Sequence, residues 1–313
     1  MENNSKEKII VVGRGPFGDT IGSIMINTGT EVEYLIKSDA LSKKSDETID
    51  INILRDASGI IIALPSQAVE GWINTFPETL KRNVRETKTL VLTKGLAPTN
   101  SQKTFLSDSL GEVFQNLSFL SGPNFSADIK NSIDNPTKTS FIGTTIATRH
   151  QKDFKKWEKL LPSFHDIEFS DDIFGVQLLG AIKNIYAIFS GIVATLGTDP
   201  STRATLVTKS RKEIRKILCF FNNAKEETFD SYAGIGDVFL TTQSKKSRNF
   251  SYGSNMTKEN ISNSKYIPEG YFALQKLASL LKEQKENFPI LFWLHNQNPP
   301  VTIEDIVELY KRF

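Results

Sequence analysis

The chain has little cysteine and almost no net charge. A single cysteine, Cys219, occurs in 313 residues, which excludes an internal disulfide framework and favours a reducing compartment such as the cytoplasm. Because Cys219 lies in an apolar, helix-like run, we expect a buried structural thiol. Lysine and arginine number 38 against 36 acidic residues. This near balance argues against nucleic acid as a partner and permits small anionic ligands.

Long hydrophobic runs are also scarce. The polar residues Met1–Lys8 lead into a short apolar run, which is typical of a first β-strand and not of a signal peptide. Gly175–Leu196 could be mistaken for a membrane span, but it carries Lys183 in its middle, which is costly in lipid. We therefore expect a helix buried in protein and no stable membrane insertion.

Short apolar runs alternate with helix-like segments in the first half of the chain. Continuous runs of isoleucine, valine and leucine with this spacing predict a parallel sheet covered by helices on both faces. The expected strands are Ile9–Val12, Val32–Ile36, Gly59–Leu64, Thr89–Thr93, Leu117–Leu120, Ser140–Ile146 and Ile167–Phe169.

The character of the sequence changes at Asp171–Ile173, after which long helical patterns dominate. We predict a dinucleotide-binding domain over residues 1–170 and a helical substrate and catalytic domain over residues 171–313. The fold class is α/β, with an N-terminal doubly wound, Rossmann-like parallel sheet and an all-helical C-terminal domain. The expected helices are Phe174–Leu196, Thr205–Asn222, Tyr271–Gln284, Ile290–Asn296 and Ile303–Lys311.

A glycine-rich loop follows the first expected strand and precedes a helical pattern. In a G-x-G-x-x-G loop the first glycine makes the tight turn, the second lets the backbone approach a pyrophosphate, and the third lets helix and strand pack closely. The helix start adds N–H donors and a favourable dipole, and proline suits its first turn. The alternative is an ordinary tight turn. The expected cofactor-binding residues here are Gly13, Gly15, Pro16, Phe17 and Gly18.

The end of the second expected strand bears on the choice between NAD and NADP. An acidic residue there binds the ribose 2′-hydroxyl, whereas a basic residue accommodates a 2′-phosphate. The strand ends at Lys37, and Asp39 follows two residues later. The sequence therefore favours NADP over NAD, unless Lys37 is only a solvated loop charge.

Ligands of open α/β sheets bind outside the carboxyl ends of the strands, so the residues that follow each strand, here called strand exits, are candidate binding residues. The exits are small or polar at Pro65-Ser66, Lys94-Gly95 and Ser121–Phe125. A lysine at position 94 would direct a positive charge into this crevice, and the glycine after it would allow close approach of the backbone. The alternative is an exposed loop lysine.

Lys183 lies in the middle of the most apolar helical pattern of the chain. A buried lysine must be paired or must lower its pKa, because desolvation disfavours its charge. Such a lysine is suited to donate and accept protons near neutral pH. The alternative is a side chain that extends its ammonium to the surface. Asn184, the next residue, offers an anchor for a substrate or a backbone group.

Two further polar clusters follow in the second half. A compact glycine-rich turn ends in Asp237, which could pair with Lys183 or bind a substrate hydroxyl. About a dozen residues later, the planar fork of donors on Arg248, with the neutral donors of Ser247 and Asn249, is suited to clamp a phosphate. The alternative is a polar surface loop.

Together these segments resemble the bacterial-type NAD(P)-dependent glycerol-3-phosphate dehydrogenases over nearly the whole chain. The resemblance rests on the order of several motifs and is therefore more specific than any one of them. The motifs are Gly13–Gly18, Ala63-Leu64-Pro65-Ser66, Thr93-Lys94-Gly95, Ser121-Gly122-Pro123-Asn124-Phe125, Leu179–Asn184, Gly234-Ile235-Gly236-Asp237, Ser247-Arg248-Asn249 and Glu269-Gly270.

The resemblance implies reversible reduction of dihydroxyacetone phosphate to sn-glycerol 3-phosphate for phospholipid synthesis in the cytoplasm, with NADP or NAD, no metal, and a homodimer as one arrangement. Lys183 would donate and accept the proton, and Asp237 would orient it. Residues implied to hold the substrate are Lys94, Gly122, Asn124, Ser247, Arg248 and Asn249. Residues implied near the cofactor, besides the glycine loop, are Lys94, Ser126, Arg248, Ile267 and Glu269, and Lys37 is added to them from its position after the second expected strand.

The segment from Lys37 to Arg55 is much shorter than the corresponding segment of the family, and that segment lies near the cofactor. Two alternatives therefore stay open. One is a related two-domain dehydrogenase that acts on a hydroxy acid or a different sugar phosphate. The other is a catalytically weak nucleotide-binding protein, such as a redox sensor.

Overall fold

The computed structural model describes residues 7–36, 51–135, 141–161, 165–258 and 267–313. The chain forms two compact units. The first comprises Met1–Thr93 with Leu106–Ile173, and the second comprises Lys94–Phe105 with Phe174–Phe313. Lys94–Phe105, which the sequence analysis assigned to the first domain, thus belongs to the second unit. A functional division at residues 170 and 171 stays a prediction.

The first unit is built on one seven-stranded sheet with the order β2-β1-β3-β4-β5-β6-β7. Its central strands are buried along their length because both faces are covered, whereas β2, at one edge, alternates between exposed and covered positions. The strands are β1 (Lys8–Val12), β2 (Glu31–Leu35), β3 (Gly59–Ile62), β4 (Lys88–Val91), β5 (Leu117–Ser121), β6 (Ile142–Thr148) and β7 (His165–Ser170).

One strand pair departs from the expected parallel sheet. β5 and β6 are antiparallel, with Ser118 opposite Thr148 and Ser121 opposite Thr145, while the other neighbouring strands are parallel. The α/β fold class is confirmed, with this one correction. Strand direction was hidden in the sequence because β6 is buried at every position, as a parallel strand is, and therefore lacks the alternation of apolar and polar residues that is typical of an antiparallel strand.

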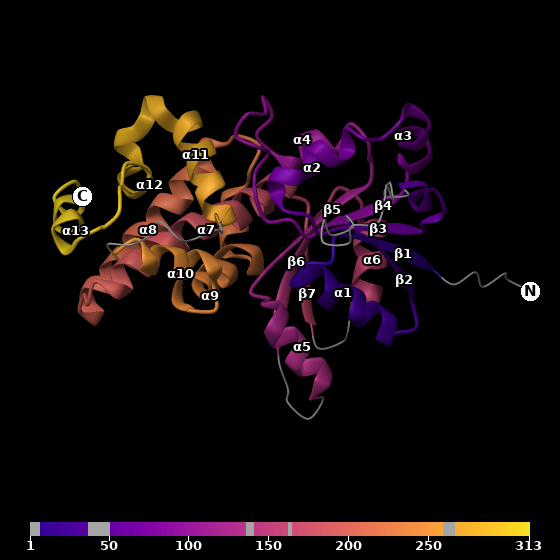
Figure 1. The fold of residues 1–313 in the computed structure, drawn as a ribbon, viewed down its shortest axis with the longest axis horizontal. Coiled ribbons are helices and arrows are strands. Elements are labelled where there is room, and N and C mark those ends of the chain that lie inside the picture. The colour runs from indigo at the N-terminus through magenta and orange to yellow at the C-terminus, as the bar shows by residue number, and fades with distance from the viewer. Residues whose placement is uncertain (1–6, 37–50, 136–140, 162–164, 259–266) are drawn as a thin grey trace, which may run out of the picture. The chain divides into compact units, whose positions relative to one another are not determined.

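Helices cover both faces of this sheet (Figure 1). Buried side chains of α1, α5 and α6 form one core cluster with the strands, including Ile21, Ile129 and Trp157. α2, α3 and α4 lie on the opposite side in Figure 1. The helices of this unit are α1 (Pro16–Asn27), α2 (Ser66–Ile73), α3 (Glu78–Val84), α4 (Leu106–Leu110), α5 (Ser126–Asp134) and α6 (Gln151–Leu160), with a 3₁₀ helix at Ile51–Asp56.

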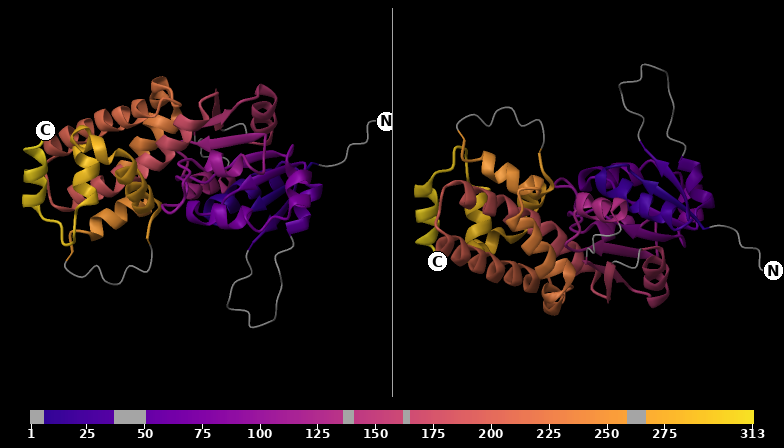
Figure 2. Two further views of the ribbon diagram at one scale, coloured as in Figure 1. Left: turned by 90° about the horizontal axis from the view of Figure 1, so that it is seen from above. Right: turned by 90° about the horizontal axis from the view of Figure 1, so that it is seen from below.

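Every regular element among the described residues of the second unit is a helix, as Figure 2 also shows. α7 lies in its core, and residues such as Leu179, Ile182 and Ile185 are fully buried. The helices are α7 (Ile173–Thr195), α8 (Pro200–Phe220), α9 (Asp237–Gln243), α10 (Arg248–Asn255), α11 (Glu269–Leu281), α12 (Pro289–His295) and α13 (Ile303–Tyr310), with shorter turns at Glu226–Asp230, Tyr232–Gly236 and Lys282–Asn287.

α7 is long and apolar enough to cross a membrane by length and composition. Within the structure, however, 83% of its most apolar 18-residue window is buried inside protein. Such burial is typical of the central helix of a globular unit, where neighbouring helices cover all of its faces. The helix thus has the environment that the sequence analysis expected for it.

Two expectations about the second unit were wrong in detail. α8 begins at Pro200, five residues before the expected Thr205, because Asp199 caps it by accepting the N–H of Thr202 at 2.9 Å. Cys219 was expected to be buried, but it is exposed. Partial desolvation and the nearby Glu226 raise the pKa of the Cys219 thiol, so exposure does not make it a reactive thiolate.

Candidate active site

The glycine loop of the first unit is packed so tightly that side chains are excluded at two positions. Gly13 has φ +94°, and a Cβ there would lie 2.8 Å from the carbonyl oxygen of Ala63. A Cβ on Gly18 would lie 2.7 Å from the carbonyl oxygen of Gly13. The first glycine therefore permits the turn and the third permits close packing of α1, as the motif predicts.

Gly15 differs from these two glycines, because a Cβ there would meet nothing within 4 Å. Gly15 precedes α1, which begins with Pro16 and has no side-chain cap. An uncapped helix start beside open space offers N–H groups and the positive end of the helix dipole to an anion. The loop thus fits a dinucleotide pyrophosphate. Phe17 lies in the first turn of α1, and Lys37 lies outside the described residues.

A second polar site in the first unit follows β5. A Cβ on Gly122 would lie 2.7 Å from the carbonyl oxygen of Gly143 in β6, so only glycine fits. The buried Asn124 donates its amide N–H to Thr144 Oγ1 at 3.1 Å. Ser126 begins α5. The roles of Gly122, Asn124 and Ser126 in binding stay predictions.

Three charged side chains meet in the second unit. Lys183 of α7 and Asp237 of α9 are 5% and 1% exposed and form an ion pair through Nζ and Oδ1. Lys94 Nζ lies 2.9 Å from the other carboxylate oxygen, Asp237 Oδ2. One carboxylate is thus shared between two ammonium groups, and this cluster carries a net positive charge when both lysines are protonated.

Burial and charge act in opposite directions on these groups. Desolvation lowers the pKa of Lys183 to about 7, although the carboxylate of Asp237 favours the charged form, and the like charge of Lys94 lowers the value further. Burial alone raises the pKa of a carboxyl group, but the two ammonium groups outweigh it and the pKa of Asp237 is lowered. Lys183 is therefore poised to exchange a proton near neutral pH, while Asp237 stays ionised.

Thr241 completes the cluster and was missed by the sequence analysis. Its hydroxyl accepts a hydrogen bond from Lys183 Nζ at 3.2 Å and donates to Asp237 Oδ1 at 3.3 Å. The signal that could have identified Thr241 is its spacing of four residues from Asp237, because residues four apart share one face of a helix. The short helix α9 was itself not expected, so the sequence offered no helix to which this spacing could be applied.

Asn184, which follows Lys183 in α7, takes part in a network of amide hydrogen bonds. Asn249 donates to Asn184 Oδ1 at 2.9 Å, and its own side-chain oxygen accepts the N–H of Gly270 at 2.9 Å. A Cβ on Gly270 would lie 2.6 Å from the carbonyl oxygen of Asn184, so α11 must begin against α7. These amides therefore join α7, α10 and α11 beside Glu269, the first residue of α11.

The start of α10 holds the predicted phosphate clamp. Ser247 caps the helix by accepting the N–H of Phe250, and Arg248 begins it with an exposed side chain. α10 approaches α7 closely, because a Cβ on Gly191 or Gly253 would overlap a carbonyl group of the other helix. Ile267 is exposed. Substrate or cofactor binding by these residues stays a prediction.

Comparison with known proteins identifies relatives along most of the chain. The family models described as NAD-dependent glycerol-3-phosphate dehydrogenase N-terminus and C-terminus match residues 40–148 and 172–296. A glycerol-3-phosphate dehydrogenase [NAD(P)+] of Campylobacter lari is 31% identical over 264 residues, covering 80% of this chain and 77% of the relative. That of Sulfurimonas denitrificans is 29% identical over 311 residues, covering 96% and 99%.

The fold has solved counterparts as well. The crystal structure of glycerol-3-phosphate dehydrogenase from Coxiella burnetii is similar, with a TM-score of 0.81 and 22% identity, covering 98% of this chain and 99% of that one. A structure from Plasmodium falciparum has a TM-score of 0.78 with 18% identity, covering 98% and 95%. At these identities the likeness shows the fold, while the sequence matches carry the relationship.

Proposed function

Because the chain belongs to the family of NAD-dependent glycerol-3-phosphate dehydrogenases, we propose that it reduces dihydroxyacetone phosphate reversibly to sn-glycerol 3-phosphate with NADPH or NADH. The protein is an oxidoreductase that acts on a CH–OH group. The observation that carries the proposed chemistry is the charge cluster of Lys183, Asp237 and Lys94, in which burial lowers the pKa of Lys183 to about 7.

The glycine loop of the first unit holds the pyrophosphate of the cofactor in this proposal. The open space at Gly15 and the uncapped start of α1 support pyrophosphate binding there, with Gly13, Pro16, Phe17 and Gly18 shaping the loop. When bound, the nicotinamide supplies the hydride that the substrate carbonyl carbon accepts. Ser126, Ile267, Glu269, Lys94 and Arg248 are proposed as further cofactor contacts, on the resemblance alone.

Lys183 serves as the acid and base of the reaction. Its ammonium donates a proton to the carbonyl oxygen of dihydroxyacetone phosphate as that oxygen gains negative charge, and its neutral amine takes the proton back in the reverse direction. Asp237 and Thr241 hold Lys183 Nζ in one position through hydrogen bonds, so that the ammonium does not have to be oriented anew for each proton transfer.

The substrate phosphate is bound by charge-assisted hydrogen bonds in this proposal. The exposed guanidinium of Arg248 begins α10, where the helix dipole also favours an anion. Ser247 and Asn249 flank it, and Gly122 and Asn124 are proposed as further substrate contacts. The net positive charge of the lysine cluster favours the same anionic substrate, because Asp237 neutralises only one of its two ammonium groups.

The preference for NADPH over NADH depends on Lys37. A lysine after the second strand favours a 2′-phosphate, which supports NADP as the preferred cofactor. Comparing kcat/KM for NADPH and NADH tests this directly, and Lys37→Ala is expected to narrow the difference. An equal preference in the unaltered chain would remove the assigned role of Lys37.

The wider setting is also proposed. The single cysteine supports a location in the cytoplasm. The family supports a small phosphorylated substrate and a role in lipid synthesis. A homodimer is supported by the exposed apolar side chains of Ile303, Val307 and Tyr310, which recur along α13. The molar mass in solution tests this, since a monomer at micromolar concentration would contradict it.

The deciding experiment follows the absorbance of reduced nicotinamide with dihydroxyacetone phosphate, separately with NADPH and NADH. Turnover with either supports the proposed reaction. The family assignment does not favour the two alternatives, and the same assay, run with other substrates, distinguishes them from the proposed reaction. Faster turnover of a hydroxy acid or another sugar phosphate would indicate the related dehydrogenase, and cofactor binding by folded protein without turnover would indicate the sensor.

A further inference from the structure

Lys276 is a buried lysine of α11 that has no part in the proposed chemistry. It is 6% exposed, and its neighbours in the sequence of α11, Leu274 and Leu277, belong to the hydrophobic core of the second unit. Burial of an ammonium group is costly unless hydrogen bonds replace its water. A methionine or leucine would fill such a position without this cost, so the contacts of the ammonium group indicate why a lysine is present.

Two of those contacts are backbone carbonyl groups of one short segment. Lys276 Nζ donates to the carbonyl oxygen of Ser101 at 2.7 Å and to that of Pro98 at 3.2 Å. The Pro98 carbonyl also accepts the N–H of Ser101 at 2.9 Å, which closes a turn. The Lys276 ammonium thus donates hydrogen bonds to the first and last carbonyl groups of this turn, and these bonds attach the turn to α11.

The same segment begins with Lys94. Residues 94–105 contain no helix or strand, so their shape depends on a few specific contacts. Leu96 and Phe105 are buried in the core of the second unit, and Ala97 N donates to Thr104 O at 3.0 Å. Lys276 adds the contact at the tip, while Lys94 at the start of the segment reaches Asp237 at 2.9 Å.

We propose that Lys276 is a positioning residue, which fixes the turn at Pro98 and Ser101 and thereby holds the ammonium of Lys94 against the carboxylate of Asp237. The proposal rests on the proposed function, because the place of Lys94 matters for turnover only if this cluster performs the chemistry. In this proposal Lys276 acts through Lys94 and not on the reacting atoms.

A consequence follows for the acid-base group. The titratable groups that act on Lys183 are Asp237 of α9, which favours its charged form, and Lys94, which disfavours it. When Lys94 moves away, the like-charge repulsion on Lys183 weakens and its pKa rises. Loss of the Lys276 ammonium is therefore expected to move the alkaline limb of the reduction rate to higher pH, which a general loss of stability would not do.

The first test reads the position of Lys94 without using activity. Reductive methylation of Lys94, followed by peptide mass spectrometry, is compared in the unaltered full-length chain, Lys276→Met and Lys276→Arg. The ion pair slows modification, so Lys94 is expected to react faster in Lys276→Met and nearly as slowly as normal in Lys276→Arg. Should Lys276→Met not fold, Lys276→Gln, which keeps a neutral donor, replaces it. Unchanged reactivity of Lys94 would overturn the proposal.

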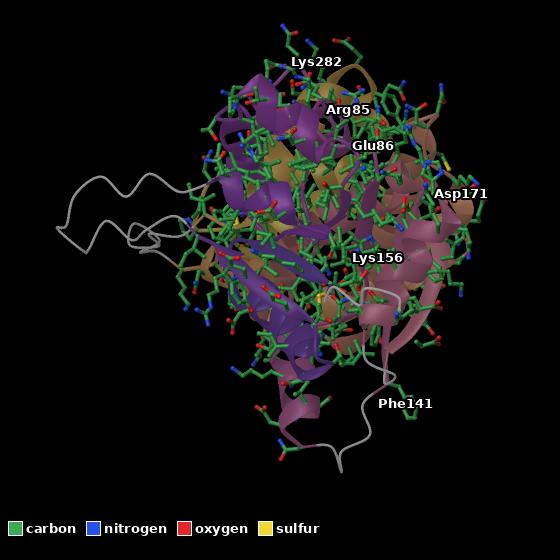
Figure 3. The ribbon with its side chains drawn as sticks, turned by 90° about the vertical axis from the view of Figure 1, so that its right-hand side faces the viewer. Arg85, Glu86, Phe141, Lys156, Asp171 and Lys282 are labelled. Carbon is green, nitrogen blue, oxygen red and sulfur yellow. The ribbon has the colours of Figure 1, made fainter. Side chains whose placement is uncertain are left out.

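A matched control comes from a lysine just past the end of the same helix. The Lys282 side chain is 70% exposed and extends from the surface in Figure 3. Lys282→Met removes one ammonium from this region without touching the turn. Lys94 reactivity, turnover and pH profile are expected to match those of the unaltered chain in this variant. A change equal to that of Lys276→Met would trace the effect to lost charge and overturn the proposal.

A double-mutant cycle then links Lys276 to Lys94 in catalysis. Lys276→Met is expected to lower kcat/KM about 10- to 100-fold, the usual result of displacing a group near the reacting atoms. On a Lys94→Met background the same change is expected to have little further effect, because the positioned group is already absent. Additive losses would show that Lys276 acts elsewhere. A chain without any turnover contradicts the proposed function, while Lys94 reactivity still decides the role of Lys276.

Discussion

The two units present opposite kinds of candidate site. In the first, glycines leave out side chains, and a Cβ on Gly13 or Gly18 would collide with neighbouring groups. In the second, the site is a set of buried charges, with Asp237 shared between Lys94 and Lys183. The first kind shapes the backbone around a bound group, whereas the second changes the pKa of a side chain. Substitutions in the glycine loop should therefore affect cofactor binding, whereas substitutions in the charge cluster should affect proton transfer.

The largest effect is expected from Lys183→Ala. Removal of the acid-base group should lower kcat for reduction of dihydroxyacetone phosphate by about 10³-fold or more. The dissociation constant for NADPH, measured by fluorescence titration, should change far less than kcat, because Lys183 is proposed to act on the substrate carbonyl and not to bind the cofactor. Loss of cofactor binding together with turnover would contradict the assignment of Lys183 to the chemical step alone.

Glu213→Ala tests whether every buried charge of the second unit serves chemistry. Glu213 accepts hydrogen bonds from the hydroxyl of Tyr186 at 2.7 Å and from the N–H groups of Ile290 and Leu291 at 3.0 and 2.8 Å. Without it three buried donors lose their acceptor, so the free energy of unfolding should fall by about 3–5 kcal/mol.

Denaturant unfolding measures this loss. Glu283, which is 86% exposed, provides the control, and Glu283→Ala should leave the free energy of unfolding nearly unchanged. The pH profile of whatever Glu213→Ala protein remains folded should match that of the unaltered chain. A shifted pH profile would mean that Glu213 belongs to the chemistry after all.

Gly15→Ala is expected to weaken cofactor binding and leave the fold intact. The added methyl group meets no protein atom within 4 Å, so it should occupy the space proposed for the pyrophosphate. The dissociation constant for NADPH should rise about 10-fold or more, equivalent to about 1.4 kcal/mol. Gly71→Ala, which also meets nothing within 4 Å, is the control. Equal affinity in both variants would remove Gly15 from the cofactor site.

The smallest and most specific effect concerns pH. Reduction requires the ammonium form of Lys183, so its rate should fall as pH rises through about 7, while oxidation of glycerol 3-phosphate should rise over the same range. Asp237→Asn removes the charge that favours protonation of Lys183 and should move this limb to lower pH. A limb that stays in place would show that another group titrates.

The sequence predicted the fold class well because both of its signals are local. Continuous apolar runs identified the strands of the first unit, and the glycine loop lies where the motif placed it. Lys183 was recognised because a charge inside an apolar helix is conspicuous in a linear sequence. Its burial beside Asp237 agrees with the expectation that such a lysine is paired.

Features that depend on contacts between distant segments were not predicted. The sharing of Asp237 between two lysines, the role of Thr241 and the hydrogen bonds of Lys276 each join residues from different elements. α9 and α10 were not expected either, because at seven and eight residues they are too short to show a helical pattern in the sequence. Strand direction at β6 was likewise invisible in its composition.

The assignment of Lys94–Phe105 to the second unit has a bearing on modularity. A gene fragment that starts near residue 171 looks like a separable cassette, yet it would lack Leu96 and Phe105 of its own core and Lys94 of its charge cluster. A single splice near residue 171 is therefore expected to leave the helical unit without part of its core and of its charge cluster. Exchange between relatives is expected to preserve the enzyme only when Lys94–Phe105 is carried together with the helices of the second unit.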